Sequence, residues 1–144
     1  MKTRLRKLHA NSREFTWTSQ IHHVTGRDCH RCVRLRAWGA GKNSQALQAD
    51  LLSKAVLPWG CATDDSYPTP MDVRAVIDYA LTHGWDPDLT GGTFFLAESD
   101  HAFELPGFFL TDRLRNPEAP DPTARVLHAW DKAKGSTSFP RPQA

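Results

Sequence analysis

The sequence predicts an α+β fold in which an antiparallel sheet of about five strands carries one amphipathic helix on one face. Segments that alternate apolar and polar residues, typical of half-buried strands, occupy the first third of the chain. A stretch with the three- and four-residue apolar spacing of a buried helix follows them. Two short segments rich in phenylalanine and a short helical stretch complete the expected order β-β-β-α-β-β-α.

Three strands joined by short loops are expected in the first part of the chain. In the first strand, Phe15, Trp17 and Ile21 share one side, which we expect to face the core. Gly26 lies in the turn that follows, where a glycine can adopt positive φ. Such a meander packs one face on a core and turns the other toward water. The expected strands span residues 13–23, 29–38 and 45–52.

The helix after Thr69 is the clearest element in the sequence. Thr69 suits the N-cap, Pro70 suits the first helical position, and Asp72 completes a capping box. Gly84 supplies the left-handed residue that often ends a helix. The predicted helix spans about ten to fifteen residues, a usual length in globular domains. Its buried stripe comprises Val73, Val76, Ile77, Ala80 and Leu81.

The rest of the chain predicts two short strands and a second helix. The strands are expected at residues 93–97 and 108–110. Asp121 and Pro122 are expected to cap the short final helix. The predicted organisation is a basic N-terminal segment (1–12), a single α+β domain (13–134) and a disordered tail (135–144).

Length and composition restrict the class of protein. A chain of 144 residues with 40% hydrophobic residues fits one domain with a real core and excludes a wholly disordered protein. No apolar run approaches the roughly 18 residues that a membrane span requires. The basic N-terminal stretch lacks the apolar segment and the cleavage site of a secretory signal. Since three cysteines cannot all pair, we expect reduced thiols and a cytoplasmic location.

Charge is strongly segregated along the chain. Residues 1–60 carry eleven Lys or Arg against three acidic residues, whereas residues 61–112 carry one Arg against ten acidic residues. Antiparallel packing could bring the two blocks together and neutralise them. If it does not, the acidic block offers a surface to a basic partner. The predicted partner-binding residues are Asp64, Asp65, Asp86, Asp88, Glu98 and Asp100.

A second candidate site lies on the expected strand 29–38. Its outward side carries His30, Arg34, Arg36 and Trp38. Guanidinium groups interleaved with an aromatic ring suit phosphate contacts and base stacking, as in proteins that bind single-stranded nucleic acid. The same residues would also keep a half-buried sheet soluble, so the alternative is a solvated strand face.

Motifs for catalysis or metal binding are weak. Cys29 and Cys32 have zinc-ligand spacing, but Cys61 is single and strand geometry turns the first two thiols to opposite faces. We therefore predict no metal site, no cofactor and no catalytic residue. Residues 39–43 resemble a fragment of a phosphate-binding loop, yet they lead into a strand, and the Gly91-Gly92 pair is also followed by a strand.

One run of the sequence resembles known proteins. It extends from Tyr67 to Asp112 and contains Tyr-Pro-Thr-Pro-x-Asp-Val-Arg, Gly84-Trp-Asp-Pro87, Gly-Gly-Thr-Phe and Leu-Pro-Gly-Phe. This run is similar to a group of small uncharacterised bacterial proteins. In size and architecture the chain also resembles the immunity proteins that neutralise bacterial toxins. That resemblance implies a cytoplasmic α+β domain that binds the catalytic face of a toxin, often by charge.

Three functional hypotheses follow. The first is a non-enzymatic protein-binding module, of the immunity or inhibitor type, that presents its acidic surface to a basic toxin or enzyme. The alternative is a nucleic-acid-binding domain that uses the basic, aromatic sheet face. The third is a small metal-dependent or hydrolytic enzyme. No membrane partner is expected, and the sequence leaves open whether unpaired sheet edges join two copies.

Overall fold

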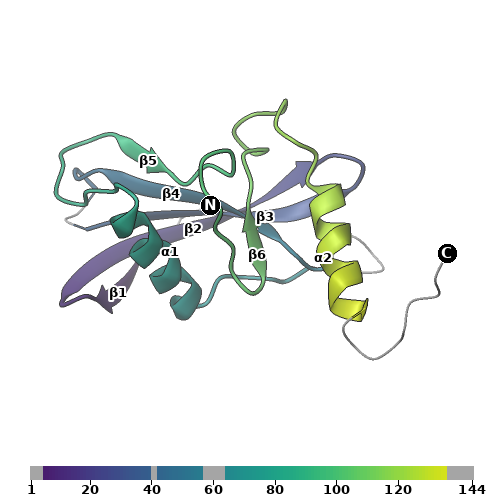
Figure 1. The fold of residues 1–144 in the computed structure, drawn as a ribbon. Helices are drawn as coiled ribbons and strands as arrows, with labels where there is room; N and C mark the ends of the chain where they lie inside the picture. The colour runs from purple at the N-terminus through teal and green to yellow at the C-terminus, as the bar shows by residue number, and fades with distance from the viewer. Residues whose placement is uncertain (1–4, 40–41, 57–63, 136–144) are drawn as a thin grey trace.

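The computed structural model describes residues 5–39, 42–56 and 64–135, and these contain six strands and two helices (Figure 1). The fold is α+β with a mostly antiparallel sheet, as predicted. No helix in these ranges reaches the length and hydrophobicity that crossing a bilayer requires. In chain order the elements are β1 (Arg6–Ala10), β2 (Arg13–Thr25), β3 (Cys29–Trp38), β4 (Ala46–Ser53), α1 (Pro70–Thr82), β5 (Thr93–Phe95), β6 (Phe108–Leu110) and α2 (Thr123–Gly135).

The sheet has the strand order β1-β2-β3-β4-β5, and β6 also pairs with β4. All pairs are antiparallel except β4 with β5, so the expectation of a purely antiparallel sheet is wrong at β5. The chain leaves the end of β4, forms α1 and returns beside the start of β4. This β-α-β crossover delivers β5 parallel to β4.

Strand β1 is an addition to the prediction, which placed residues 1–12 outside the domain. Residues Arg6–Ala10 pair with β2, and Asn11 and Ser12 form the connecting turn with φ of 52° and 62°. Ala10 is buried and Leu8 packs against the core, while Lys7 is exposed. Two apolar positions among basic residues are too short a pattern to predict a strand. The predicted tail (135–144) lies outside the described residues, apart from Gly135.

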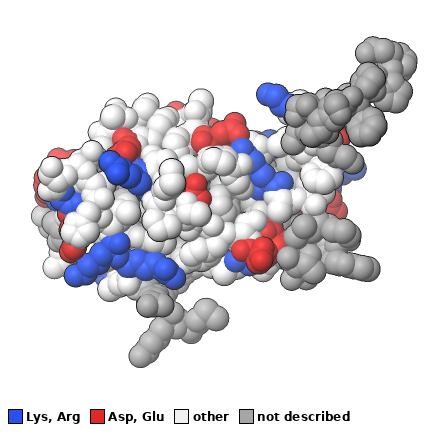
Figure 2. All heavy atoms as spheres, turned by 90° about the horizontal axis from the view of Figure 1, so that it is seen from below, with Lys and Arg blue, Asp and Glu red and all other residues white. Residues whose placement is uncertain are grey.

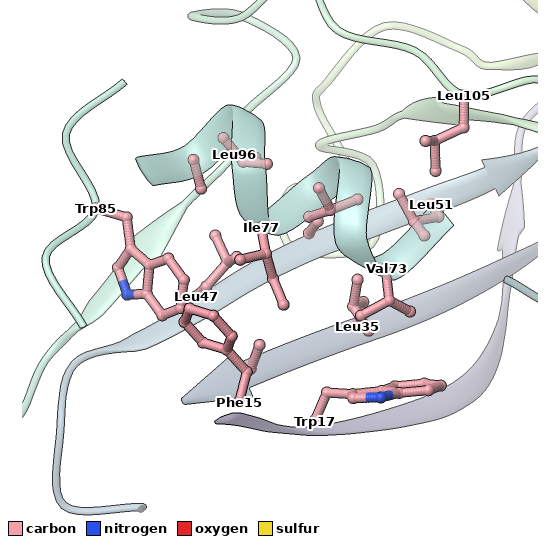
Figure 3. Packing of buried hydrophobic residues seen from close by; sticks show 14 of the residues in the cluster. Phe15, Trp17, Leu35, Leu47, Leu51, Val73, Ile77, Trp85, Leu96 and Leu105 are labelled. Atoms are coloured by element: carbon pink, nitrogen blue, oxygen red, sulfur yellow. The ribbon is translucent and has the colours of Figure 1, made fainter. Parts of the chain in front are cut away.

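Helix α1 packs on one face of the sheet, which we call the first face (Figure 3). Its start matches the prediction, because Thr69 and Asp72 form a reciprocal capping box and Pro70 opens the helix. Gly84 follows the helix with φ of 114°. The buried cluster beneath α1 joins Val73, Val76 and Ile77 to strand residues that include Phe15, Trp17, Leu35, Leu47 and Leu51.

Helix α2 packs on the opposite face, which we call the second face. Neighbouring residues of a strand point to opposite sides, so Cys32 and Leu52 lie opposite the α1 cluster. Both are buried against Val126 of α2 together with Val24. The two helices thus cover different faces at different ends of the sheet (Figure 1). The prediction that the second face turns toward water is therefore wrong at this end, and β4 is buried along its whole length.

Two details of β2 and its turn also differ from the prediction. Ile21 was expected to face the core but is 48% exposed, because the buried α1 cluster holds Phe15 and Trp17 but does not extend to Ile21. Gly26 does not adopt positive φ. A Cβ there would instead lie 2.0 Å from a carboxylate oxygen of Asp121, which accepts hydrogen bonds from the amides of Arg27 and Thr123. Gly26 therefore allows the start of α2 to approach the β2–β3 turn.

Candidate functional site

The predicted acidic residues begin with Asp64 and Asp65, at the end of β4. Asp64 is buried, and its carboxylate accepts a hydrogen bond from the amide of Ser66. Burial would raise the pKa of Asp64, but hydrogen bonds from Ser53 and Ser66 and the charge of Arg31 hold it below its ordinary value. Asp64 is thus part of the fold and offers little surface. Asp65 is exposed.

Asp86 and Asp88 lie at the other end of β4. The amide of Asp86 donates a hydrogen bond of 3.3 Å to the side-chain oxygen of Gln45, just before the strand begins. Asp88 forms an ion pair of 2.9 Å with Arg13, and the hydrogen bond from that guanidinium lowers the pKa of Asp88. Since β4 has eight residues, the two ends lie about 23 Å apart.

Glu98 and Asp100 form a third, separate location. Glu98 accepts hydrogen bonds from Arg125 at 2.8 Å and from the amide of Asp112 at 2.9 Å. Asp100 is exposed in the turn that follows β5. In Figure 2, acidic groups lie in small separate clusters, several of them beside basic groups. The structure therefore does not gather the six predicted carboxylates on one surface.

The predicted basic residues divide between two ends of the second face. His30 and Arg34 lie at the covered end, which we define as β3 residues 29–34 and their neighbours under α2 and the segment before it. The ring of His30 lies 2.9 Å from the hydroxyl of Thr123, and burial lowers its pKa. Arg34 donates to both oxygens of buried Asp50 at 2.9 and 3.2 Å, and this hydrogen bonding raises the pKa of Arg34. The side chains of both residues therefore already have partners within the protein.

Arg36 and Trp38 lie at the open end of the second face, which we define as β3 residues 36–38 and their neighbours. Here the structure has a cavity of about 390 Å³. β2 and β3 supply four of its residues because Thr18 pairs with Arg36 and Gln20 pairs with Arg34 in register. The lining comprises Thr18, Gln20, Arg36, Trp38, Lys42, Ser44, Ala46, Gly91 and Gly92.

The cavity brings two positive charges to one aromatic ring. The guanidinium carbon of Arg36 lies 5.4 Å from the centroid of Trp38, and Nζ of Lys42 lies 5.5 Å from it. Neither cation forms an ion pair with a carboxylate of the described residues, and no carboxylate is in the lining. Nε of Arg36 is buried and has no hydrogen-bond partner. An anion in the cavity would supply the missing acceptor and counter-charge.

The glycine pair shapes the wall of this cavity. Gly91 and Gly92 have φ of 73° and 80°, values that side-chain-bearing residues rarely adopt. The amide of Gly91 donates to the carbonyl of Asn43, and the carbonyl of Gly92 accepts from the amide of Ala46. The pair thus ties the segment before β5 to the start of β4. It leaves main chain, without side chains, at the cavity wall.

A second cavity, of about 500 Å³, contrasts with the first. It lies between the 98–104 loop, β6 and α2. Its carboxylates are already paired, Glu98 with Arg125 and Glu104 with Lys54. The same two cations also lie 4.5 and 4.6 Å from the ring of Phe109. The carboxylates and cations of this cavity neutralise one another, so the cavity should attract a charged ligand less strongly than the first one does.

The cysteines do not form a metal site in the described residues. No group of three or more His, Cys, Asp or Glu that could hold a metal ion occurs there. Cys29 is disulfide-bonded, which contradicts the expectation of reduced thiols. Cys32 is free and buried, and burial raises the pKa of its thiol. Cys61 lies outside the described residues.

The sequence predicted Arg36 and Trp38 as site residues, but it did not predict the opposite side of the cavity, which contains Lys42 and the glycine pair. Lys42, Gly91 and Gly92 lie in glycine-bearing segments that lead into strands instead of helices, so the sequence predicts no phosphate-binding loop there. The signal was present in composition, since both segments are rich in glycine and one carries a lysine. What the sequence could not show is that the crossover places them together. Comparison with protein families, curated proteins and solved structures found no match to this chain.

Proposed function

We propose that the protein is a non-enzymatic binding module for single-stranded nucleic acid. Its phosphate groups bind in the cavity at the open end of the second face. The observation that carries this proposal is the pair of cations, Arg36 and Lys42, held at Trp38 without a carboxylate partner in the described structure. Arg13 and Arg34, which also lie on the sheet, are paired with Asp88 and Asp50.

The chemistry of the lining favours phosphate over other ligands. A guanidinium presents a planar fork of donors that matches two phosphate oxygens, and an ammonium adds a point charge. Thr18 and Ser44 place hydroxyl groups at the same cavity. Because no carboxylate lines it, a cationic ligand would find no partner there.

The surroundings of the cavity favour an extended single strand. Trp38 is 5% exposed, so its ring holds the cations and is not a platform for bases. Phe95 is 40% exposed and pairs in register with Gln48, which places it on the second face, where the guanidinium carbon of Arg115 lies 4.5 Å from the centroid of its ring. Exposed aromatic rings beside a cationic groove are the usual arrangement for sequence-independent binding of single strands.

The test is binding of a fluorescein-labelled twelve-nucleotide oligothymidylate, measured by anisotropy at low salt. We expect Arg36→Gln and Lys42→Gln each to weaken binding about tenfold or more, since a hydrogen bond to a charged group contributes about 1.5–3 kcal/mol. Arg74→Gln is the matched control, because Arg74 lies on α1 and the first face and is 55% exposed. That variant should bind as the unmodified protein does.

Three outcomes discriminate between the hypotheses. If no oligonucleotide binds at low salt, the proposal fails. If thymidine monophosphate or inorganic phosphate binds with the affinity of the oligonucleotide, the ligand is a small phosphate compound and the nucleic-acid assignment fails. If Arg74→Gln weakens binding as much as Arg36→Gln, the attraction is diffuse and the cavity is not the site. The acidic protein-binding surface stays a prediction, and its separated carboxylates give it less support.

A further inference from the structure

Strand β2 is much longer than the strand that borders it. β1 pairs only with residues 13–17 of β2, while β3 pairs with β2 as far as Thr25. On its outer side the stretch 18–25 therefore pairs with no strand of the described chain. An unpaired edge of this length is a template for another strand.

The register identifies which main-chain groups point outward along this edge. In the two-residue turn at Asn11 and Ser12, the flanking residues form the hydrogen-bonded pair, so odd-numbered residues of β2 point their N–H and C=O groups toward β1. Beyond β1 these residues are Ser19, Ile21 and His23. The next residue in the series, Thr25, fits this alternation because its carbonyl accepts a hydrogen bond of 3.0 Å from Arg113.

The chemistry of the edge lacks the usual protection against pairing. Exposed edges commonly carry charged residues or proline, yet no Lys, Arg, Asp, Glu or Pro occurs from Phe15 to Gly26. The strand instead exposes an aliphatic residue, since Ile21 is 48% exposed. No charge on this edge would repel an identical edge at neutral pH.

We propose that this edge pairs antiparallel with the same edge of a second copy of the chain. A two-fold axis at Ile21 places Ile21 opposite Ile21 and Ser19 opposite His23 of the other copy, so that the outward N–H and C=O groups of all three residues find partners. The two exposed isoleucines then bury each other at the centre of the interface. The two sheets become one continuous sheet.

The symmetry has a consequence for the second face. A two-fold axis perpendicular to a sheet reverses strand direction but keeps each face on its own side. The open ends of both copies therefore face the same way. A dimer of this kind would present two cationic cavities to one long polyanion, a consequence that rests on the proposed function, whereas the dimer itself does not.

The experiment is sedimentation velocity of the full chain across a range of concentrations at neutral pH. The expected species has twice the 16.2 kDa of one chain. Ile21→Lys places two like charges directly opposite each other and should raise the dissociation constant about tenfold or more. Leu89→Lys is the matched control, since Leu89 is a 51% exposed leucine outside β2, and it should leave the dimer unchanged.

Hydrogen exchange supplies a readout that does not depend on any substitution. The amides of Ser19, Ile21 and His23 should exchange more slowly as protein concentration rises. A chain that stays monomeric at every concentration would overturn the proposal, and so would a dimer that Ile21→Lys leaves intact. Slow exchange of these amides in a chain that sediments as a monomer would assign the edge to a segment of the same chain and would overturn it too.

Discussion

The two ends of the second face are built from the same strands, with the same alternation of side chains between the two faces, but their charged residues differ in whether they have partners within the protein. At the covered end, Arg34 is bound by buried Asp50, and His30 lies against Thr123 at the start of α2. At the open end, two residues further along β3, Arg36 has no acidic partner in the described structure. An arginine on a strand face is therefore available to a ligand only where nothing else in the fold has already paired with it.

The difference arises from what lies above each end. Helix α2 and the segment before it bring Val126, Thr123 and Arg115 over the covered end, and Arg115 lies 3.7 Å from Asp50. No helix of the described chain covers the open end, where the glycine pair supplies only main chain. The availability of Arg36 at the open end is thus a consequence of missing cover, not of a special sequence motif.

The largest expected effect is at Asp50, whose side chain is 1% exposed. Asp50→Asn removes the charge that holds Arg34 and Arg115, so it should lower the free energy of unfolding by about 2–3 kcal/mol. Both arginines reach solvent in part, which keeps the loss below that of a fully buried pair. Urea denaturation measures the change.

Arg36→Gln is the matched change at the open end. It removes a cation of the same strand and face without breaking an ion pair, so the free energy of unfolding should stay within about 0.5 kcal/mol. If Asp50→Asn and Arg36→Gln were destabilised equally, the distinction between an arginine paired within the fold (Arg34) and one without an acidic partner (Arg36) would be wrong.

A smaller effect is expected at His30 as pH falls. Burial lowers the pKa of His30 in the folded protein below its value of 6.5 in the unfolded chain. Above that value the imidazole is neutral in both states. Below it the unfolded chain takes up the proton first, so the free energy of unfolding falls as pH decreases. His30→Gln should reduce this slope between pH 7 and pH 5, as measured by urea titrations across that range.

A slope that is the same in the variant would show that His30 is not buried as a neutral ring under α2. In that case only the ion pair of Arg34 with Asp50 would distinguish the covered end from the open end. The corresponding substitution at the open end, Lys42→Gln, serves as the reference and should leave the slope unchanged.

Local patterns in the sequence predicted much of the fold. The capping box at Thr69 and Asp72 and the bounds of β3 and β6 follow from neighbouring residues alone, and the structure confirms them. The parallel direction of β5 and the placement of α2 on the second face depend on how distant segments meet. Those contacts leave no periodic signal in the sequence.

The candidate site was predictable only in part, for the same physical reason. Alternation along β3 places Arg36 and Trp38 on one face, and this requires no tertiary information. The ion pair between Arg13 and Asp88, which neutralises one of the predicted acidic residues, depends on tertiary packing, because the two residues are 75 positions apart. The contact of Lys42 with Trp38 also depends on how the chain folds. Net charge by segment therefore overstated the acidic surface.

The most direct test of the account is the salt dependence of oligothymidylate binding. Each phosphate contact contributes about 0.7 to the slope of log affinity against log salt concentration for single strands. The variant that combines Arg36→Gln with Lys42→Gln should lose about 1.4 from this slope, in addition to its loss of affinity, while Arg74→Gln should lose none. An unchanged slope in the double variant would contradict the claim that the open end of the second face binds phosphate.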